Sequence, residues 1–244
     1  MWIKICGVTN VDDAQAIVDA GADAVGLNFF AKSKRFVSGD AARTICNAVK
    51  SNLDVVGVFV NSPAEEVVET VNRVQLAAVQ FHGDETTASI AAVHESCPDV
   101  AIVRAFRLRA GGVGDLIQSI RELQQNAVPL AAVLVDAFVA DEYGGTGHMI
   151  DADLFKEFRQ QLGSPADVSE YSGRSVPPTP APRVILAGGL TAETVAAAVD
   201  ASQPWGIDTA SGVETSPGVK SSEKIRRFVK AVRTKMPSEP RDRL

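Results

Sequence analysis

Cysteine is scarce in this sequence and follows no disulfide or ligand pattern. The 244 residues include three cysteines, Cys6, Cys46 and Cys97. An odd number without a CxxC pair argues against a disulfide framework and against a structural zinc site. The three histidines, at positions 82, 94 and 148, also lack the spacing of metal ligands. We therefore expect no metal, and a reducing, cytoplasmic location fits this cysteine usage best.

Long apolar runs and an excess of positive charge are also missing. No apolar stretch approaches the roughly 20 residues of a membrane span, and the first apolar run follows Met1 directly, which leaves no room for a signal peptide. The formal net charge is −6 and the pI is near 5.2, so we expect neither nucleic acid nor a membrane as a partner. Oligomeric state is not predicted, because an exposed apolar patch is a property of the folded surface.

Apolar stretches and helical patterns alternate eight times along the chain. Strands are predicted at residues 2–6, 24–28, 54–60, 77–81, 101–106, 131–136, 183–187 and 205–209. The helices that follow them are predicted at residues 13–20, 40–50, 64–72, 86–96, 114–125, 151–162, 191–200 and 221–234. The almost uninterrupted apolar run at 131–136 is typical of a parallel strand buried on both faces. This order predicts an α/β fold, the (β/α)8 or TIM barrel; the alternative, an open doubly wound sheet, lacks its GxGxxG turn after the first strand.

One domain is expected over residues 1–236. Residues 163–182 are proline-rich and longer than an ordinary helix-to-strand loop. Because this insertion joins the sixth helix to the seventh strand, it leaves from the face opposite the one where barrels do chemistry. We expect it to be mobile and dispensable for activity, and we expect the charged tail at 237–244 to be frayed.

Polar residues mark the carboxyl ends of the predicted strands, where barrel active sites are built. They are Cys6, Asn28, Asn61, His82, Arg104 with Arg107, Asp136, Gly188 with Gly189, and Ser211 with Gly212. Side chains alternate along a strand, so Lys4 shares a face with Cys6. The thiol, the imidazole and the carboxyl each have a structural alternative: Cys6 as a buried core cysteine, His82 as a hydrogen-bonded rim histidine, and Asp136 as a turn or helix cap.

Two turns of small residues look suited to an anion. Gly188 and Gly189 precede a helix expected near Thr191, and Ser211 and Gly212 follow the eighth strand. Such turns let backbone N–H groups approach a phosphate, and a helix N-terminus adds roughly 0.3 to 1 kcal/mol. Turns without a ligand are the alternative. The glycines at 144–147 predict a loop that closes over substrate, or a surface turn.

Eight motifs resemble the phosphoribosylanthranilate isomerase family of tryptophan biosynthesis, in the family's order. They are KICGVT at 4–9, GADAVG at 21–26, SKR at 33–35, VGVF at 56–59, VQFHGDE at 79–85, Asp136 with GGTG at 144–147, LAGGL at 186–190, and Asp208 with SGVE at 211–214 and PGVK at 217–220. The resemblance implies a cofactor-free Amadori rearrangement of a phosphosugar–anthranilate substrate. The family usually has prolines around its Ser-x-Arg motif, where this chain has Ala31, Lys32, Ser33 and Lys34.

The resemblance also implies roles for individual residues. Cys6 matches the general base and Asp136 the general acid, while Arg35 matches the residue that meets the anthranilate carboxylate. His82 and Asp208 match further substrate contacts. The phosphate cradle is matched by Gly188, Gly189, Ser211 and Gly212.

The chemistry of these groups leads to two electrostatic expectations. Lys4 beside Cys6 should lower the thiol pKa, and partial burial should keep Asp136 protonated. Two rival functions remain. The histidine-pathway isomerase barrel has an aspartate where this chain has Cys6, and a non-catalytic phosphate-binding barrel is expected to lack Cys6 or Asp136.

Overall fold

The computed structural model describes residues 1–137, 151–163, 181–235 and 244. The predicted glycine loop at 144–147 lies outside these residues, as do most of the insertion at 163–182 and of the tail at 237–244. Predictions about those segments therefore stay predictions.

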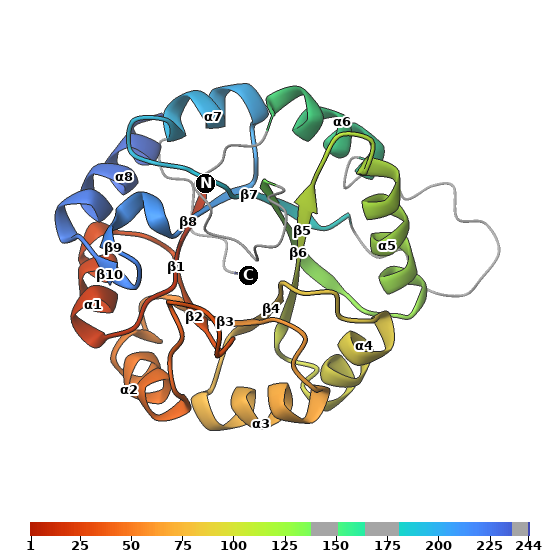
Figure 1. Ribbon diagram of the computed structural model, residues 1–244, viewed down its shortest axis with the longest axis horizontal. Coiled ribbons are helices and arrows are strands. Elements are labelled where there is room, and N and C mark those ends of the chain that lie inside the picture. The colour runs from red at the N-terminus through yellow and green to blue at the C-terminus, as the bar shows by residue number, and fades with distance from the viewer. Residues whose placement is uncertain (138–150, 164–180, 236–243) are drawn as a thin grey trace.

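Eight parallel strands close into a barrel in the order β1 to β8, as predicted, and helices surround it (Figure 1). The strands are β1 (Trp2–Cys6), β2 (Ala24–Asn28), β3 (Asp54–Phe59), β4 (Ala78–Phe81), β5 (Ala101–Leu108), β6 (Leu130–Ala137), β7 (Arg183–Leu186) and β8 (Gly206–Thr209). The helices are α1 (Val11–Ala20), α2 (Gly39–Val49), α3 (Ala64–Val74), α4 (Thr87–Ser96), α5 (Val113–Gln125), α6 (Ala152–Leu162), α7 (Val195–Ser202) and α8 (Ser222–Lys235). The TIM-barrel prediction is confirmed.

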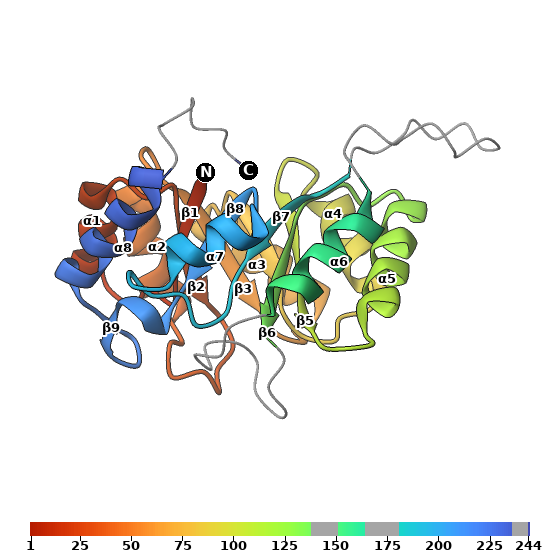
Figure 2. The same ribbon diagram turned by 90° about the horizontal axis from the view of Figure 1, so that it is seen from above.

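Three short elements after β8 were not predicted. They are the 3-10 helix η2 (Ser211–Val213) and the antiparallel strands β9 (Glu214–Ser216) and β10 (Val219–Lys220). The strand β9 lies at the edge of the barrel opposite the N-terminus (Figure 2). This hairpin therefore belongs to the face where the strands end.

Local signals explain why the helices begin and end where they do. The side chain of Asn10 accepts a hydrogen bond from the N–H of Asp13 at the start of α1, and Gly21 ends α1 with a φ of 79°. Ser38 caps α2 in the same way. In the described part of the chain, no helix is long and apolar enough to cross a membrane.

The barrel wall separates two apolar layers. Ile3 and Ile5 of β1 belong to the larger layer between strands and helices, whereas Trp2 belongs to the layer inside the barrel. On β6, Val133 and Val135 face the helices, whereas Ala132 and Leu134 belong to the inner layer. Since side chains alternate along a strand, Lys4 and Cys6 face the interior like Trp2.

The amino-terminal half of the interior is filled by apolar side chains. Members of this inner layer include Trp2, Ala24, Val56, Ala78, Val103, Ala105, Ala132, Leu134, Ile185 and Ala187. The rings of Trp2 and Trp205 stack with centroids 5.5 Å apart, and the Arg183 guanidinium lies 4.5 Å from the Trp205 ring. Because Ala132 and Leu134 face inward, Asp136 does so too, on the carboxyl side of this layer.

Candidate active site

Cys6 ends β1 beside a buried ion pair. The ammonium of Lys4 is fully buried and lies 2.8 Å from the Asp208 carboxylate of β8. The facing residue on β2 is Gly26, where an added Cβ would lie 2.7 Å from the Cys6 sulfur and 3.2 Å from the Lys4 nitrogen. A glycine is therefore needed at this position, because any side chain would displace the thiol or the ammonium.

The charge state of the Cys6 thiol differs from the expectation. Burial raises its pKa above the usual value, and Asp208 adds to that rise, while Lys4 and Lys220 act in the opposite direction. Lys4 lowers the thiol pKa as expected, but the effect of burial is larger. The reason is that Asp208 already balances the ammonium charge, while the thiol loses the water that would solvate its anion.

Arg35 lies across the glycine turn that follows Cys6. Gly7 has a φ of 76°, and an added Cβ there would lie 2.3 Å from the Arg35 Cδ. The Arg35 guanidinium donates from Nε and Nη2 to the two oxygens of Glu214, each at 2.8 Å. This bidentate pair uses two of the five N–H groups of an arginine.

Glu214 and Lys220 come from the β9–β10 hairpin, and sequence reasoning assigned no role to either. Their side chains form a buried ion pair of 2.8 Å. The sequence does contain a signal for this pair, because Pro217 and Gly218 between them are a typical turn dipeptide. The spacing indicates a hairpin, but not the groups to which it would be tied.

Asp136 and His82 lie on the other side of the barrel mouth. Asp136 at the end of β6 is 5% exposed, and it pairs in register with Arg107 of β5. The His82 Nε2 lies 3.9 Å from the Asp136 Oδ2, which is too long for a hydrogen bond. In the ring order β1 to β8, only β7 and β8 separate the strand of Asp136 from that of Cys6 on the shorter path.

His82 is held as a neutral side chain. Burial lowers its pKa to about 3, and Lys4, Arg104 and Arg107 add to the shift. The Gln80 amide nitrogen lies 2.8 Å from His82 Nδ1. With this amide as donor, Nδ1 is the acceptor and the ring proton is on Nε2. That nitrogen is buried and has no hydrogen-bond partner among the described residues.

The two predicted phosphate turns lie after β7 and β8. Gly188 and Gly189 have φ values of 91° and 59°, which glycine adopts without strain. At Gly212 an added Cβ would lie 1.9 Å from the Leu190 carbonyl oxygen, so the second turn packs tightly against the first. A pocket of about 200 Å³ is lined by the second turn, by the residues just after the first turn and by α8, namely by Ser211, Gly212, Thr191, Ala192, Glu193, Lys224 and Arg227.

The helix after Gly189 begins later than predicted. It was expected near Thr191, but α7 starts at Val195. Thr191 to Thr194 form a turn instead, in which the Thr191 N–H donates to the Thr194 hydroxyl at 3.0 Å. The predicted helix N-terminus is thus displaced by about one turn, and the second turn, at Ser211 and Gly212, forms the start of the short helix η2.

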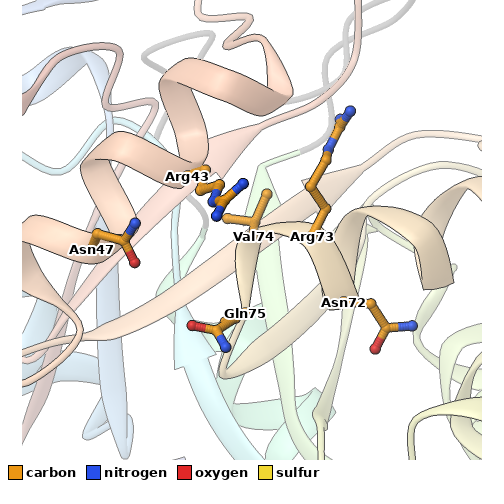
Figure 3. A pocket seen from close by; sticks show the side chains of 6 residues that line it. All are labelled: Arg43, Asn47, Asn72, Arg73, Val74 and Gln75. Carbon is orange, nitrogen blue, oxygen red and sulfur yellow. The ribbon is translucent and has the colours of Figure 1, made fainter.

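A pocket of about 320 Å³ lies on the outer surface between α2 and α3 (Figure 3). It is lined by Arg43, Asn47, Asn72, Arg73, Val74 and Gln75. This lining contains no thiol and no carboxyl, so it offers no acid–base pair. Among the described residues there is also no group of three or more side chains suited to a metal ion. The barrel mouth is therefore the candidate active site.

Most predicted site residues lie around this mouth. Lys4 and Asp208 are joined by an ion pair, while His82 and Asp136 are near neighbours. Arg35 is close to Cys6 but is paired with Glu214. The arrangement places a thiol and a carboxyl on different sides of one interior, where one can accept and the other donate a proton.

The chain resembles one family throughout most of its length. A family model described as N-(5'-phosphoribosyl)anthranilate (PRA) isomerase matches residues 3–231. A protein of that name from Ralstonia nicotianae is 35% identical over 237 residues, which cover 95% of this chain and 92% of the relative. Another, from Pseudomonas fluorescens (strain Pf0-1), is 39% identical over 230 residues and covers 94% and 97%.

Solved structures give the same result. The phosphoribosyl anthranilate isomerases from Thermus thermophilus and Thermotoga maritima each have a TM-score of 0.76, at 29% and 30% identity, and cover 96% of this chain and 99% of theirs. A third structure is that isomerase in complex with reduced 1-(o-carboxyphenylamino)-1-deoxyribulose 5-phosphate, with a TM-score of 0.74 and 30% identity over 96% of this chain and 99% of its own.

Proposed function

The chain belongs to the N-(5'-phosphoribosyl)anthranilate isomerase family, and we propose that Cys6 and Asp136 are the general base and general acid of its reaction. The enzyme is an aldose–ketose isomerase of tryptophan biosynthesis. It converts N-(5-phosphoribosyl)anthranilate to 1-(2-carboxyphenylamino)-1-deoxyribulose 5-phosphate.

The reaction needs one proton donor and one proton acceptor. Protonation of the furanose ring oxygen opens the ring to a protonated Schiff base, and removal of the C2 proton then gives an enolamine that tautomerises to the ketone. The inward position of Cys6 on β1 and of Asp136 on β6 supports the assignment, because the two strands are not neighbours in the barrel. A sugar between them would meet one group on each side.

Cys6 is assigned the base because its anion would have cations beside it. An ordinary cysteine is only a few per cent thiolate near pH 7. Lys4 and Lys220 both act to lower the pKa of this thiol, although burial outweighs them. A base that is mostly protonated at rest still works when proton removal is fast, at the cost of a smaller active fraction.

Asp136 is assigned the general acid because its neighbour His82 cannot donate the proton. His82 has a pKa of about 3, so it is neutral at pH 7 and has no acidic imidazolium proton to give. Its buried Nε2–H, which has no partner among the described residues, supports a role as hydrogen-bond donor to the substrate. Asp208 borders the same space and holds the ammonium of Lys4 in place.

The two ends of the substrate are assigned to separate anion sites. Arg35 keeps three N–H groups after pairing with Glu214, and these can meet the anthranilate carboxylate. The phosphate is assigned to the backbone N–H groups of Gly188, Gly189, Ser211 and Gly212, at the position usual for phosphate in this fold. These contacts would orient the sugar between Cys6 and Asp136.

We also propose that the enzyme works in the cytoplasm on a small-molecule substrate. All three cysteines are free thiols, which suits a reducing compartment. Location of a fluorescently tagged, full-length chain by microscopy and cell fractionation tests this directly; a periplasmic or secreted signal would contradict it.

Growth rescue of a tryptophan auxotroph that lacks this isomerase tests the assignment of the base. The wild-type chain should restore growth, and Cys6→Ala should not, at equal protein level on an immunoblot. Rescue by Cys6→Ala would remove Cys6 from the role. Failure of the wild-type chain, folded and expressed, would favour the non-catalytic phosphate-binding barrel.

A further inference from the structure

The ammonium of Lys220 is buried at a junction of three elements, and apart from its effect on the pKa of the Cys6 thiol no role has been given to it. Its Nζ donates to the Cys6 carbonyl at 2.6 Å, to the Ala210 carbonyl at 3.1 Å and to Glu214 Oε1 at 2.8 Å. These three acceptors use all three hydrogens of the ammonium. They lie at the end of β1, just after β8, and in the β9–β10 hairpin.

Glu214 extends this junction to the arginine. Its two oxygens accept from Arg35 Nε and Nη2, from the Gly218 N–H at 3.2 Å, and from Lys220. Only 4% of the Glu214 side chain is exposed, and none of the Lys220 side chain. Two cations share one anion here, so the cluster carries one net positive charge, which suits a bound carboxylate.

From this geometry we propose that Lys220 and Glu214 are positioning residues for the isomerisation. Lys220 fixes the backbone of Cys6 relative to the turn at Ser211 and Gly212, and Glu214 fixes the direction of Arg35. This inference rests on the proposed roles of Cys6, Arg35 and the phosphate turn. The base and both anion sites are thereby held at set distances by one buried ion pair.

The pair is well suited to this task because its bonds are buried and charge-assisted. Such bonds are roughly twice as strong as neutral ones, and misplacement of a reacting group by about 1 Å can cost about 100-fold in rate. Four charged groups face Cys6: Lys4 of β1, Asp208 of β8, Lys220 of β10 and Arg35 after β2. Removal of Lys220 therefore changes both the place and the charge environment of the thiol.

Two variants separate the two halves of the proposal. Lys220→Met keeps an unbranched side chain and leaves Glu214 paired with Arg35; we expect kcat to fall about 10- to 100-fold. Glu214→Gln turns an amide N–H₂ toward the Arg35 Nη2, which displaces the guanidinium; we expect KM to rise about tenfold, with kcat within about threefold of wild type. Lys230→Met, at an exposed position of α8, is the matched control and should leave both constants unchanged.

A measurement without substrate distinguishes positioning from general damage. Alkylation of Cys6 by iodoacetamide, followed by peptide mass spectrometry across pH, reports the thiolate directly. In Lys220→Met we expect the alkylation curve to shift to higher pH and the rate at pH 7 to fall about tenfold, as one pKa unit implies. The curve for Lys230→Met should match that of wild type.

Wild-type kcat and an unshifted alkylation curve in folded Lys220→Met would overturn the proposal. So would a fall in kcat that equals the loss of folded protein by circular dichroism. Should Lys220→Met not fold, Lys220→Gln, which keeps two N–H donors, replaces it with the same criteria. The assignment of Cys6 as base fails separately, if Cys6→Ala retains turnover, and that outcome leaves the alkylation difference standing.

Discussion

The two sides of the barrel mouth are built differently. On the thiol side, formed by β8, β1 and the β9–β10 hairpin, the buried cations are paired with carboxylates at 2.8 Å, as Lys4 is with Asp208 and Lys220 with Glu214. On the carboxyl side, formed by β4 to β6, His82 is neutral and lies 3.9 Å from Asp136. Fixed ion pairs surround Cys6, the proposed base, and an uncharged donor lies beside Asp136, the proposed acid.

Removal of either proposed reacting group is the strongest test of this difference. We expect Cys6→Ala and Asp136→Asn each to lower kcat about 10²- to 10⁴-fold, roughly 3 to 5 kcal/mol, the usual range for acid or base catalysis. Steady-state kinetics of the purified enzyme measure it. Cys97→Ala, at a cysteine that ends α4, is a control expected to keep its turnover; near wild-type turnover in Asp136→Asn would take the acid role from Asp136.

A methyl group added at Gly212, which lies in the proposed phosphate turn, should disturb the thiol side of the barrel mouth. Because its Cβ would lie 1.9 Å from the Leu190 carbonyl oxygen, the backbone must move, and we expect a cost of roughly 2 kcal/mol in stability together with a KM about tenfold higher. Urea denaturation and steady-state kinetics give the two values. Gly114→Ala in α5 is the matched control, since no atom lies within 4 Å of its added Cβ; equal behaviour of the two variants would refute the close packing of the turns.

The neutral state of His82 predicts a pH dependence of stability on the carboxyl side. Its folded pKa of about 3 is below the ordinary 6.5, so between these values the unfolded chain binds a proton that the folded chain does not. Stability should therefore fall as the pH drops below about 6.5, by roughly 3 kcal/mol from this group at pH 4.5. In His82→Gln, the free energy of unfolding, measured by urea denaturation at each pH, should change less between pH 7 and 4.5 than in wild type. The same pH dependence in variant and wild type would contradict the buried neutral histidine.

The smallest expected effect is on the arginine of the thiol side. Arg35→Met should raise KM about tenfold, about 1.4 kcal/mol, and leave kcat nearly unchanged, because a carboxylate clamp acts in ground and transition states alike. Glu214 keeps Lys220 and the Gly218 N–H as partners in this variant, so the fold should tolerate it. Arg43→Met, in the outer pocket of Figure 3, is the matched control; an unchanged KM in Arg35→Met would assign the carboxylate elsewhere.

The barrel was predictable because its strands carry their own signal. The apolar run of β6 indicates a strand that is buried on both faces. The inward direction of Asp136, at the end of that run, then follows from the alternation of side chains along a strand. Strands β9 and β10 were missed because they have only three and two residues, too few for a periodic pattern. Pro217 and Gly218 indicated a turn but no strands beside it.

The sequence predicted which residues lie at the site better than it predicted which charged groups pair with each other there. Arg35 and Glu214 are 179 positions apart, so their contact depends on barrel closure rather than on any local pattern. The thiol of Cys6 was expected to have a lowered pKa because Lys4 is two residues away, yet burial raises it. Sequence spacing predicts which groups are near each other, but not how much water each one loses.

The apolar layer around Trp2 and Trp205 has one more consequence. It closes the amino-terminal half of the barrel, so the described residues leave the interior no opening on that side. Substrate and product must pass through one and the same opening, and the site cannot be refilled until it has been emptied. The ketose product is therefore expected to inhibit the enzyme as a simple competitor of the substrate.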